Sequence, residues 1–463
     1  MSRKRREGGH EAGSVDRRSF LKSSAGSALF ASVAGFGGSA ASAEVRGPHQ
    51  PRGFENAFAR NEYEARWARV QAAMAAAGHE NLVVWQRSAG TYDKVGDVYW
   101  LTNFQTYGTG QDPATDATGA PWTFSAVLIR KGQEPELHIG MTEDDIDRPS
   151  LAFGKLVMHE PNMMVRFAEY LRDAGVEGRV AVVGDDVLPA MSDRVLRRHT
   201  PQIEWVAEYQ LLEGPQLVKS ARELEIYREA GALVSSALDA AMKAMLAGER
   251  SCEAAARAAS ILMSGGGGFH RISVNHGPML ENGLSKAYYG YDTRAPNPGD
   301  LVTVWIYGPI LAGYWLDPGR TAVCGSRPTP AQKALVEDCA TYVEKMVKAI
   351  RPGATPRDVG IRWAEIEREG AYFDGGKPDS GNEGHGFGHG LATSFPGYVL
   401  PIGDAEIGPF GYRRLQETLK PGMVLAAEAF LSRPGVGSAG VENNFIVTET
   451  GAELLDKSPM IYW

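Results

Sequence analysis

Two histidines that stand four residues apart among glycines are the feature that most constrains this chain. The stretch at residues 384–390 reads Gly-His-Gly-Phe-Gly-His-Gly and contains His385 and His389. Because glycine has no side chain, such a stretch lets the backbone approach a bound group closely. An imidazole is also costly to bury without a polar partner. We therefore expect the fold to bring this stretch against a ligand.

Three acidic residues lie on either side of this stretch in the sequence. Asp317 precedes it in Tyr-Trp-Leu-Asp-Pro-Gly-Arg, Glu428 ends the apolar run Met-Val-Leu-Ala-Ala-Glu, and Glu442 follows in Gly-Val-Glu-Asn-Asn. A carboxylate in an apolar strand needs a partner, so Glu428 favours a ligand or catalytic acid. One imidazole and three carboxylates are hard-to-borderline ligands, which suit Mn, Fe or Co and also accept Zn. In the competing interpretation, His389 is a hydrogen-bonded core histidine and Asp317 pairs with Arg320.

The length of 463 residues exceeds what one hydrophobic core usually holds, so we expect two domains. Strands and helices alternate over residues 44–214, which predicts an α/β domain. Residues 215–463 combine strands with longer helical patterns, and the predicted class of the whole chain is α+β. The helical patterns there cover residues 216–247, 252–263, 328–350 and 356–370.

Residues 1–43 have the three parts of a twin-arginine export signal. A basic start is followed by Arg17-Arg18 before Ser-Phe-Leu-Lys, then by a mildly apolar run, and then by Ala-Ser-Ala before Glu44. The run is too short and too weakly apolar to stay as a membrane anchor after cleavage. We expect a periplasmic or secreted protein that begins near Glu44.

Net charge and cysteine content exclude two classes of protein. The formal net charge of −8 argues against a nucleic-acid partner, because such proteins usually carry a basic face. The three cysteines, Cys252, Cys324 and Cys339, are too few for a disulfide framework and have no C-x-x-C spacing. The sequence leaves open whether one disulfide forms.

Several motifs together resemble the pita-bread metallohydrolases, the family of methionine aminopeptidase, aminopeptidase P, prolidase and creatinase. Residues 98–104 are similar to the YLTGF strand of creatinase and prolidase, and Pro298-Gly299-Asp300 is similar to the turn before the first ligand strand. Segments 421–424 and 447–451 match the surroundings of the two glutamates. The resemblance implies a creatinase-like N-terminal domain, a pita-bread catalytic domain and a homodimer.

The resemblance also implies a metal site, with one departure from the family's pattern. Family members bind two ions through two aspartates, a histidine and two glutamates. Asp317, His389, Glu428 and Glu442 match four of these residues, but Trp305 stands where the first aspartate is expected. We therefore expect one divalent ion held by those four residues. The alternatives are a metal-free site, as in creatinase, and two ions.

Two histidines that steady a peptide group in the family's peptidases are missing here. His276 is the nearest imidazole to one of them, and we consider His276, His385 and Glu428 as catalytic residues. The primary hypothesis is a hydrolase that cleaves a peptide or small amide with metal-activated water. The alternative is a non-peptidase enzyme that cleaves a C–N or C–S bond in a small molecule, like creatinase or the dimethylsulfoniopropionate lyases. A catalytically inactive binding protein is a third class.

Overall fold

We describe a computed structural model of the chain. The predicted signal segment, residues 1–43, and the first part of the predicted N-terminal domain lie outside the described residues. Within the described part, no helix is both long and apolar enough to cross a membrane. The structure describes residues 58–87, 96–104, 124–140, 150–159, 162–185, 188–281, 287–362, 372–373, 385–386, 388–393 and 418–463.

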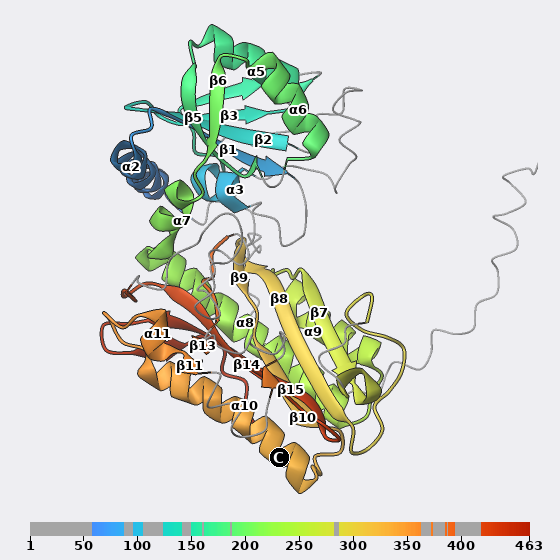
Figure 1. The fold of residues 1–463 in the computed structure, drawn as a ribbon. Coiled ribbons are helices and arrows are strands. Elements are labelled where there is room, and N and C mark those ends of the chain that lie inside the picture. The colour runs from blue at the N-terminus through green and yellow to red at the C-terminus, as the bar shows by residue number, and fades with distance from the viewer. Residues whose placement is uncertain are drawn as a thin grey trace, which may run out of the picture. The chain divides into compact units, whose positions relative to one another are not determined.

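A six-stranded mixed sheet forms the first part of the described chain, with the strand order β4-β3-β2-β1-β5-β6 (Figure 1). β1 pairs with β2 antiparallel and with β5 parallel. The elements are α2 (Arg60–Ala77), β1 (Asn81–Arg87), α3 (Gly96–Thr102), β2 (Phe124–Arg130), β3 (Glu136–Ile139), β4 (Lys155–Met158), α5 (Met163–Asp173), β5 (Gly178–Val183), α6 (Ala190–His199) and β6 (Ile203–Ala207).

The alternation of side chains along β1 explains why helices cover both faces of this sheet. Successive strand residues point to opposite faces. Leu82 and Val84 join the core that includes α2 and α3, whereas Val83 and Trp85 join the core that includes α5 and α6. Strands that are buried on both faces read as continuous apolar runs, which agrees with the α/β layer predicted from the sequence.

An eight-stranded antiparallel sheet forms the second part, with the order β12-β14-β15-β10-β8-β7 and with β16 and β9 attached to β15 and β8. Helices α8 and α9 pack on β8 and β7, and α10 packs on β14 and β15 (Figure 1). The strands are β7 (Arg271–His276), β8 (Leu301–Leu311), β9 (Tyr314–Leu316), β10 (Gly319–Val323), β12 (Tyr372–Phe373), β14 (Val424–Arg433), β15 (Gly437–Val447) and β16 (Ala452–Leu454).

The remaining elements are mostly helices. A short strand pair, β11 with β13, lies apart from the eight-stranded sheet. These elements are α7 (Gln210–Leu217), α8 (Ala221–Leu246), α9 (Ser251–Ser264), the 3₁₀ helix η5 (Gly277–Leu280), α10 (Pro330–Ala349), α11 (Pro356–Val359), β11 (Ile361–Arg362) and β13 (His385–Gly386). The observed class is α+β, as predicted. The domain boundaries at 43 and 214 stay predictions.

The helix predicted over residues 216–247 is broken in the structure into α7 and α8. Between them, the Lys219 amide donates to the carbonyl of Gly422 at 2.9 Å. Ser220 then caps α8: its hydroxyl accepts from the Glu223 amide, while the Glu223 carboxylate accepts from the Ser220 amide. This reciprocal pair satisfies amides that have no partner within a helix, so it fixes where α8 begins.

Two further sequence predictions differ from the structure. The strand expected at residues 98–104 is largely the helix α3, in which the Asn103 amide donates to the Tyr99 carbonyl at 2.7 Å. Asn103 then adopts a φ of 61°, which ends the helix. The helix expected over 356–370 stops at Val359, because residues 361–362 pair as a strand with β13. Residues 363–370 lie outside the described residues.

Candidate metal centre

A row of side chains crosses four strands of the second sheet. The strand register places Trp305 of β8 opposite Gly319 of β10, Gly319 opposite Glu442 of β15, and Glu442 opposite Glu428 of β14. Directly paired residues of antiparallel strands point to the same face. Two of the predicted ligands, Glu428 and Glu442, therefore share one face of the sheet with the Trp305 indole.

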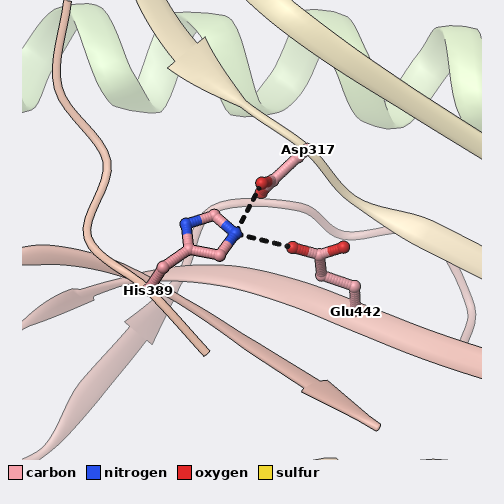
Figure 2. Close-up of side chains that lie close together, drawn as sticks. All are labelled: Asp317, His389 and Glu442. Atoms are coloured by element: carbon pink, nitrogen blue, oxygen red, sulfur yellow. Dashed lines mark ion pairs between the residues drawn. The ribbon is translucent and has the colours of Figure 1, made fainter. Parts of the chain in front are cut away.

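Asp317 and His389 complete a compact cluster with Glu442. One ligand atom from each of the three residues lies within 4.8 Å of the other two. Nε2 of His389 is 3.0 Å from Oδ2 of Asp317 and 3.7 Å from Oε1 of Glu442. Figure 2 shows the two carboxylates pointing at the same ring nitrogen. The structure thus brings together three of the four predicted ligands.

The backbone next to His389 runs alongside β14, which places its ring over the sheet. The Ala426 amide donates to the His389 carbonyl at 2.8 Å, and the Leu391 amide donates to the Val424 carbonyl at 3.0 Å. Gly388 lies so close to β14 that a Cβ atom there would be 2.1 Å from the Ala426 carbonyl oxygen. A glycine at this position is therefore required by the close approach of the two chains.

Asn444 holds Asp317 through both its side chain and its backbone. Nδ2 of Asn444 donates to Oδ1 of Asp317 at 2.6 Å, and Oδ1 of Asn444 accepts from the Asp317 amide at 2.9 Å. Asn444 lies two residues beyond Glu442 on β15 and therefore faces the same side of the sheet. Sequence reasoning missed this residue because it assigned no role to the asparagines that follow Glu442. A strand that includes both Glu442 and Asn444 would have revealed the shared face.

Arg320 does not pair with Asp317, which removes one competing interpretation of that aspartate. The Arg320 guanidinium is fully buried and pairs with Asp456. It also donates to the Glu442 carbonyl at 2.6 Å and to the Gly319 carbonyl at 2.8 Å. Arg320 therefore ties β10 to β15 and fixes the backbone that carries Glu442, while the Asp317 carboxylate stays available to the cluster.

Burial and close charges perturb the pKa of each group in the cluster. Burial disfavours the charged ring of His389, but the Asp317 carboxylate outweighs it and raises the pKa of His389 to about 9. Burial alone would raise the pKa of Asp317, but interactions that include the charge and hydrogen bond of the His389 ring outweigh burial, so the pKa of Asp317 is lowered. Burial, followed by the charges of Asp317 and Glu428, raises the pKa of Glu442 well above its usual value. These shifts share one physical cause, the closeness of the carboxylates to one another and to the ring, and a positive charge between them is favourable.

The donor set fits a divalent cation. Oε1 of Glu442 is buried, and it has no hydrogen-bond partner among the described residues. A buried carboxylate oxygen without a donor is costly unless a cation satisfies it. Oxygen atoms from Asp317 and Glu442 and a nitrogen from His389 are the ligand types that suit Mn, Fe, Co or Zn.

Glu428 lies beside this cluster and is not one of its three closest members. It stands opposite Glu442 in the strand pairing, and its charge contributes to the raised pKa values of both His389 and Glu442. Glu428 is also less buried than Asp317 and Glu442. It is placed to serve as a further ligand or to exchange protons at the edge of the centre.

His276, which was also named from the sequence, is not brought into the cluster. His276 pairs with Val302 in the register, and Val302 lies three residues from Trp305 along β8, so the two point to opposite faces. His276 therefore lies on the sheet face opposite Trp305, where its Nε2 is 3.5 Å from Oδ1 of Asp292. This placement gives no support to His276 as a catalytic base. The side chain of His385 lies outside the described residues, so its predicted role is not addressed by the structure.

Comparison with known proteins gives a family-model match over part of the chain and a fold over most of it. Residues 225–449 match the model described as metallopeptidase family M24. An Xaa-Pro dipeptidase from Pyrococcus furiosus is 25% identical over 331 residues, which covers 70% of this chain and 83% of that protein.

Two solved structures resemble the chain over most of its length. An Xaa-Pro dipeptidase from Bacillus anthracis superposes with a TM-score of 0.65 at 20% identity and covers 86% of this chain and 100% of its own. A variant of Escherichia coli aminopeptidase P gives a TM-score of 0.60 at 16% identity, covering 86% of this chain and 95% of that one. These likenesses confirm the pita-bread fold predicted from the motifs. The family match confirms the prediction of a metallohydrolase at the level of enzyme class.

Proposed function

We propose that this chain is an exported metal-dependent hydrolase that acts on a short peptide or a small amide, with one divalent ion at Asp317, His389 and Glu442. The observation that carries the proposal is the buried cluster of these three residues, with Glu428 opposite Glu442 on the same sheet face. The named relatives cleave Xaa-Pro dipeptides or belong to the aminopeptidase P type, and their substrates support the choice of a peptide or amide bond.

In this proposal, different residues bind the ion, orient a ligand and transfer protons. Asp317, His389 and Glu442 would hold the ion, while Asn444 fixes the Asp317 carboxylate. When bound, a divalent ion polarises a carbonyl oxygen and lowers the pKa of a coordinated water. Glu428 is less buried and beside the cluster, so its carboxylate would accept a proton from the attacking water and return it to the leaving amine.

A second candidate is a non-peptidase enzyme that cleaves a C–N or C–S bond of a small molecule. The Trp305 indole favours this candidate. It lies on β8 beside Glu442, where the peptidases of the family are expected to have the first aspartate ligand. The two candidates share the metal cluster and differ in substrate. A panel of Xaa-Pro dipeptides, small amides and sulfonium compounds, tested with the same preparation, separates them.

Metal analysis of the purified chain is the experiment that tests the proposal. We expect about one Mn, Fe, Co or Zn ion per chain without added metal, and its loss in His389→Ala together with the hydrolytic activity. His199→Ala is the matched control, because His199 is an exposed histidine on α6 and should leave the metal content unchanged. A metal-free wild-type chain that stays fully active would overturn the proposal.

Export and dimerisation belong to the same proposal and have their own tests. Replacement of Arg17 and Arg18 by lysine should retain the chain in the cytoplasm, because both arginines form the twin-arginine signature. The unaltered precursor should yield a mature chain that begins near Glu44, which mass spectrometry of the secreted or periplasmic fraction measures. Light scattering of that mature chain should give the mass of a homodimer.

A further inference from the structure

The Trp305 indole is bound to one particular oxygen of the Glu442 carboxylate. Its Nε1 donates to Oε2 of Glu442 at 2.8 Å. The other oxygen, Oε1, lies 3.7 Å from Nε2 of His389 and has no hydrogen-bond partner among the described residues. The two oxygens of the Glu442 carboxylate therefore differ: Oε2 accepts a hydrogen bond from Trp305, and Oε1 faces His389.

The Trp305 indole is closely packed between two glycines and an aromatic ring. A Cβ atom on Gly319 would lie 1.8 Å from the Trp305 ring, and a Cβ atom on Gly440 would lie 2.9 Å from it. Phe430 stacks on the indole with the ring centroids 5.4 Å apart and an angle of 29° between the planes. Two glycines on neighbouring strands and one aromatic ring therefore hold Trp305 in place beside Glu442.

We propose that Trp305 limits the metal centre to one ion by occupying Oε2 of Glu442 and the space next to it. This inference rests on the proposed function, since it assumes that Asp317, His389 and Glu442 bind an ion. The indole Nε1 is a hydrogen-bond donor with no acceptor capacity, so it cannot act as a metal ligand. Oε1 remains free to bind the ion, whereas Oε2 is used to fix the orientation of the carboxylate.

A second ion would also lack ligand atoms on this side of Glu442, because an indole stands there in place of a carboxylate. On the Trp305 side of Glu442, the register places Gly319 and Gly440 around the indole, and glycine offers no side-chain ligand. A divalent ion of this kind needs several oxygen or nitrogen donors around it. Trp305 is therefore a positioning residue that sets both the binding mode of Glu442 and the number of ions.

Two substitutions at position 305 test the inference on the full mature chain. Trp305→Asp frees Oε2 and adds a carboxylate in the cavity that the indole leaves, so Mn²⁺ binding should rise from one ion to two per chain. Trp305→Phe keeps an aromatic ring but removes the donor, so the stoichiometry should stay at one while Mn²⁺ affinity falls by about 10- to 100-fold, as for other groups that orient a ligand. Trp85→Phe is the control, since Trp85 is a fully buried tryptophan of the first sheet.

Equilibrium dialysis with elemental analysis gives the stoichiometry, and electron paramagnetic resonance of bound Mn²⁺ shows whether two ions are coupled. Two ions in the wild type would overturn the inference, as would a folded Trp305→Asp variant that still binds one. If Trp305→Asp does not fold, an unchanged or higher affinity in Trp305→Phe overturns it. No ion in the wild type would instead refute the proposed function itself, so the two failures are distinguishable.

Discussion

The Asn444 side chain makes two hydrogen bonds to Asp317. Its Nδ2 donates to the Asp317 carboxylate at 2.6 Å, and its Oδ1 accepts from the Asp317 backbone amide at 2.9 Å. This pair fixes which way the carboxylate points before any ion binds. We predict that Asn444→Ala lowers metal affinity by about 10- to 100-fold, because the ligand loses the partner that orients it. Competition of Co²⁺ binding with a chelator of known affinity measures the effect.

Asn443→Ala is the matched control for that prediction. Asn443 is the next residue on β15, is equally buried, and points to the other side of the sheet, where its Nδ2 donates to the sulfur of Met460 at 3.3 Å. Its loss should affect the unfolding midpoint and leave metal affinity within about threefold, far less than for a group that orients a ligand. Equal losses of affinity in the two variants would show that Asn444 acts through general stability alone.

Glu223 is the centre of a buried polar network that joins α2 and α3 to α8 and β9. Its Oε1 accepts from Nε1 of Trp100 at 2.9 Å and from the Tyr314 hydroxyl at 2.8 Å, and it lies 3.4 Å from the Arg66 guanidinium. Removing one partner of a buried ion pair leaves the other charge uncompensated. We predict that Glu223→Ala lowers the free energy of unfolding by about 3–5 kcal/mol, which urea unfolding measures.

Glu225→Ala provides the comparison on the same helix. Glu225 pairs with Arg222 on the solvent side at 2.9 Å, and both side chains are largely exposed. Exposed pairs of this kind contribute less than about 1 kcal/mol. A Glu223→Ala variant that lost no more stability than Glu225→Ala would mean that the buried network contributes little to holding these elements together.

The sequence predicted the ligand strands well because their signals are local. The apolar run 423–428 is a signal of this kind, and the acid at its end lies on β14 as expected. The cluster of Asp317, His389 and Glu442 was also anticipated, since carboxylates and an imidazole in apolar surroundings need one another. For these positions the residue types and the resemblance to the pita-bread family pointed to the same set.

What the sequence could not supply was the pairing of distant strands. The face on which His276 lies depends on the register of β7 with β8, and a shift by one residue would exchange the two faces. The hydrogen bond between Trp305 and Glu442 depends on β10 lying between their strands. Capping also mattered, because Ser220 and Glu223 divide what reads as one helix into two.

Lys219 is a buried cation whose cost to stability should depend on pH. Burial lowers the pKa of Lys219 to about 8, below the value of about 10.4 for an unfolded chain. Between these two values the unfolded state binds more protons, so the free energy of unfolding rises as the pH rises from about 8 to about 10.4. Below pH 8 the charged amine costs up to about 3 kcal/mol in the folded state.

Lys219→Met should remove that cost and that slope. We predict a variant more stable than the wild type at pH 7, with an advantage that shrinks towards pH 10, as measured by urea unfolding at each pH. Lys243→Met is the control, because the Lys243 side chain is 71% exposed and pairs with Asp239 on α8. A difference between wild type and Lys219→Met that stayed constant from pH 7 to 10 would contradict the lowered pKa.

His276 offers the last prediction, since the sequence suggested it as a general base and the strand register places it on the face away from the metal cluster. Its Nε2 lies 3.5 Å from Asp292, whose pKa of about 2 reflects hydrogen bonds from Arg294, Ser251 and His276 that overcome burial. We predict that His276→Asn leaves metal affinity and kcat within about threefold while lowering the free energy of unfolding by about 1–2 kcal/mol. Glu428→Gln, measured in parallel, should lower kcat by at least about 100-fold through loss of proton transfer. A loss of kcat in His276→Asn as large as that in Glu428→Gln, with unchanged stability, would contradict this prediction. His276 would then have to act on the substrate, although the register places it on the sheet face away from the metal cluster.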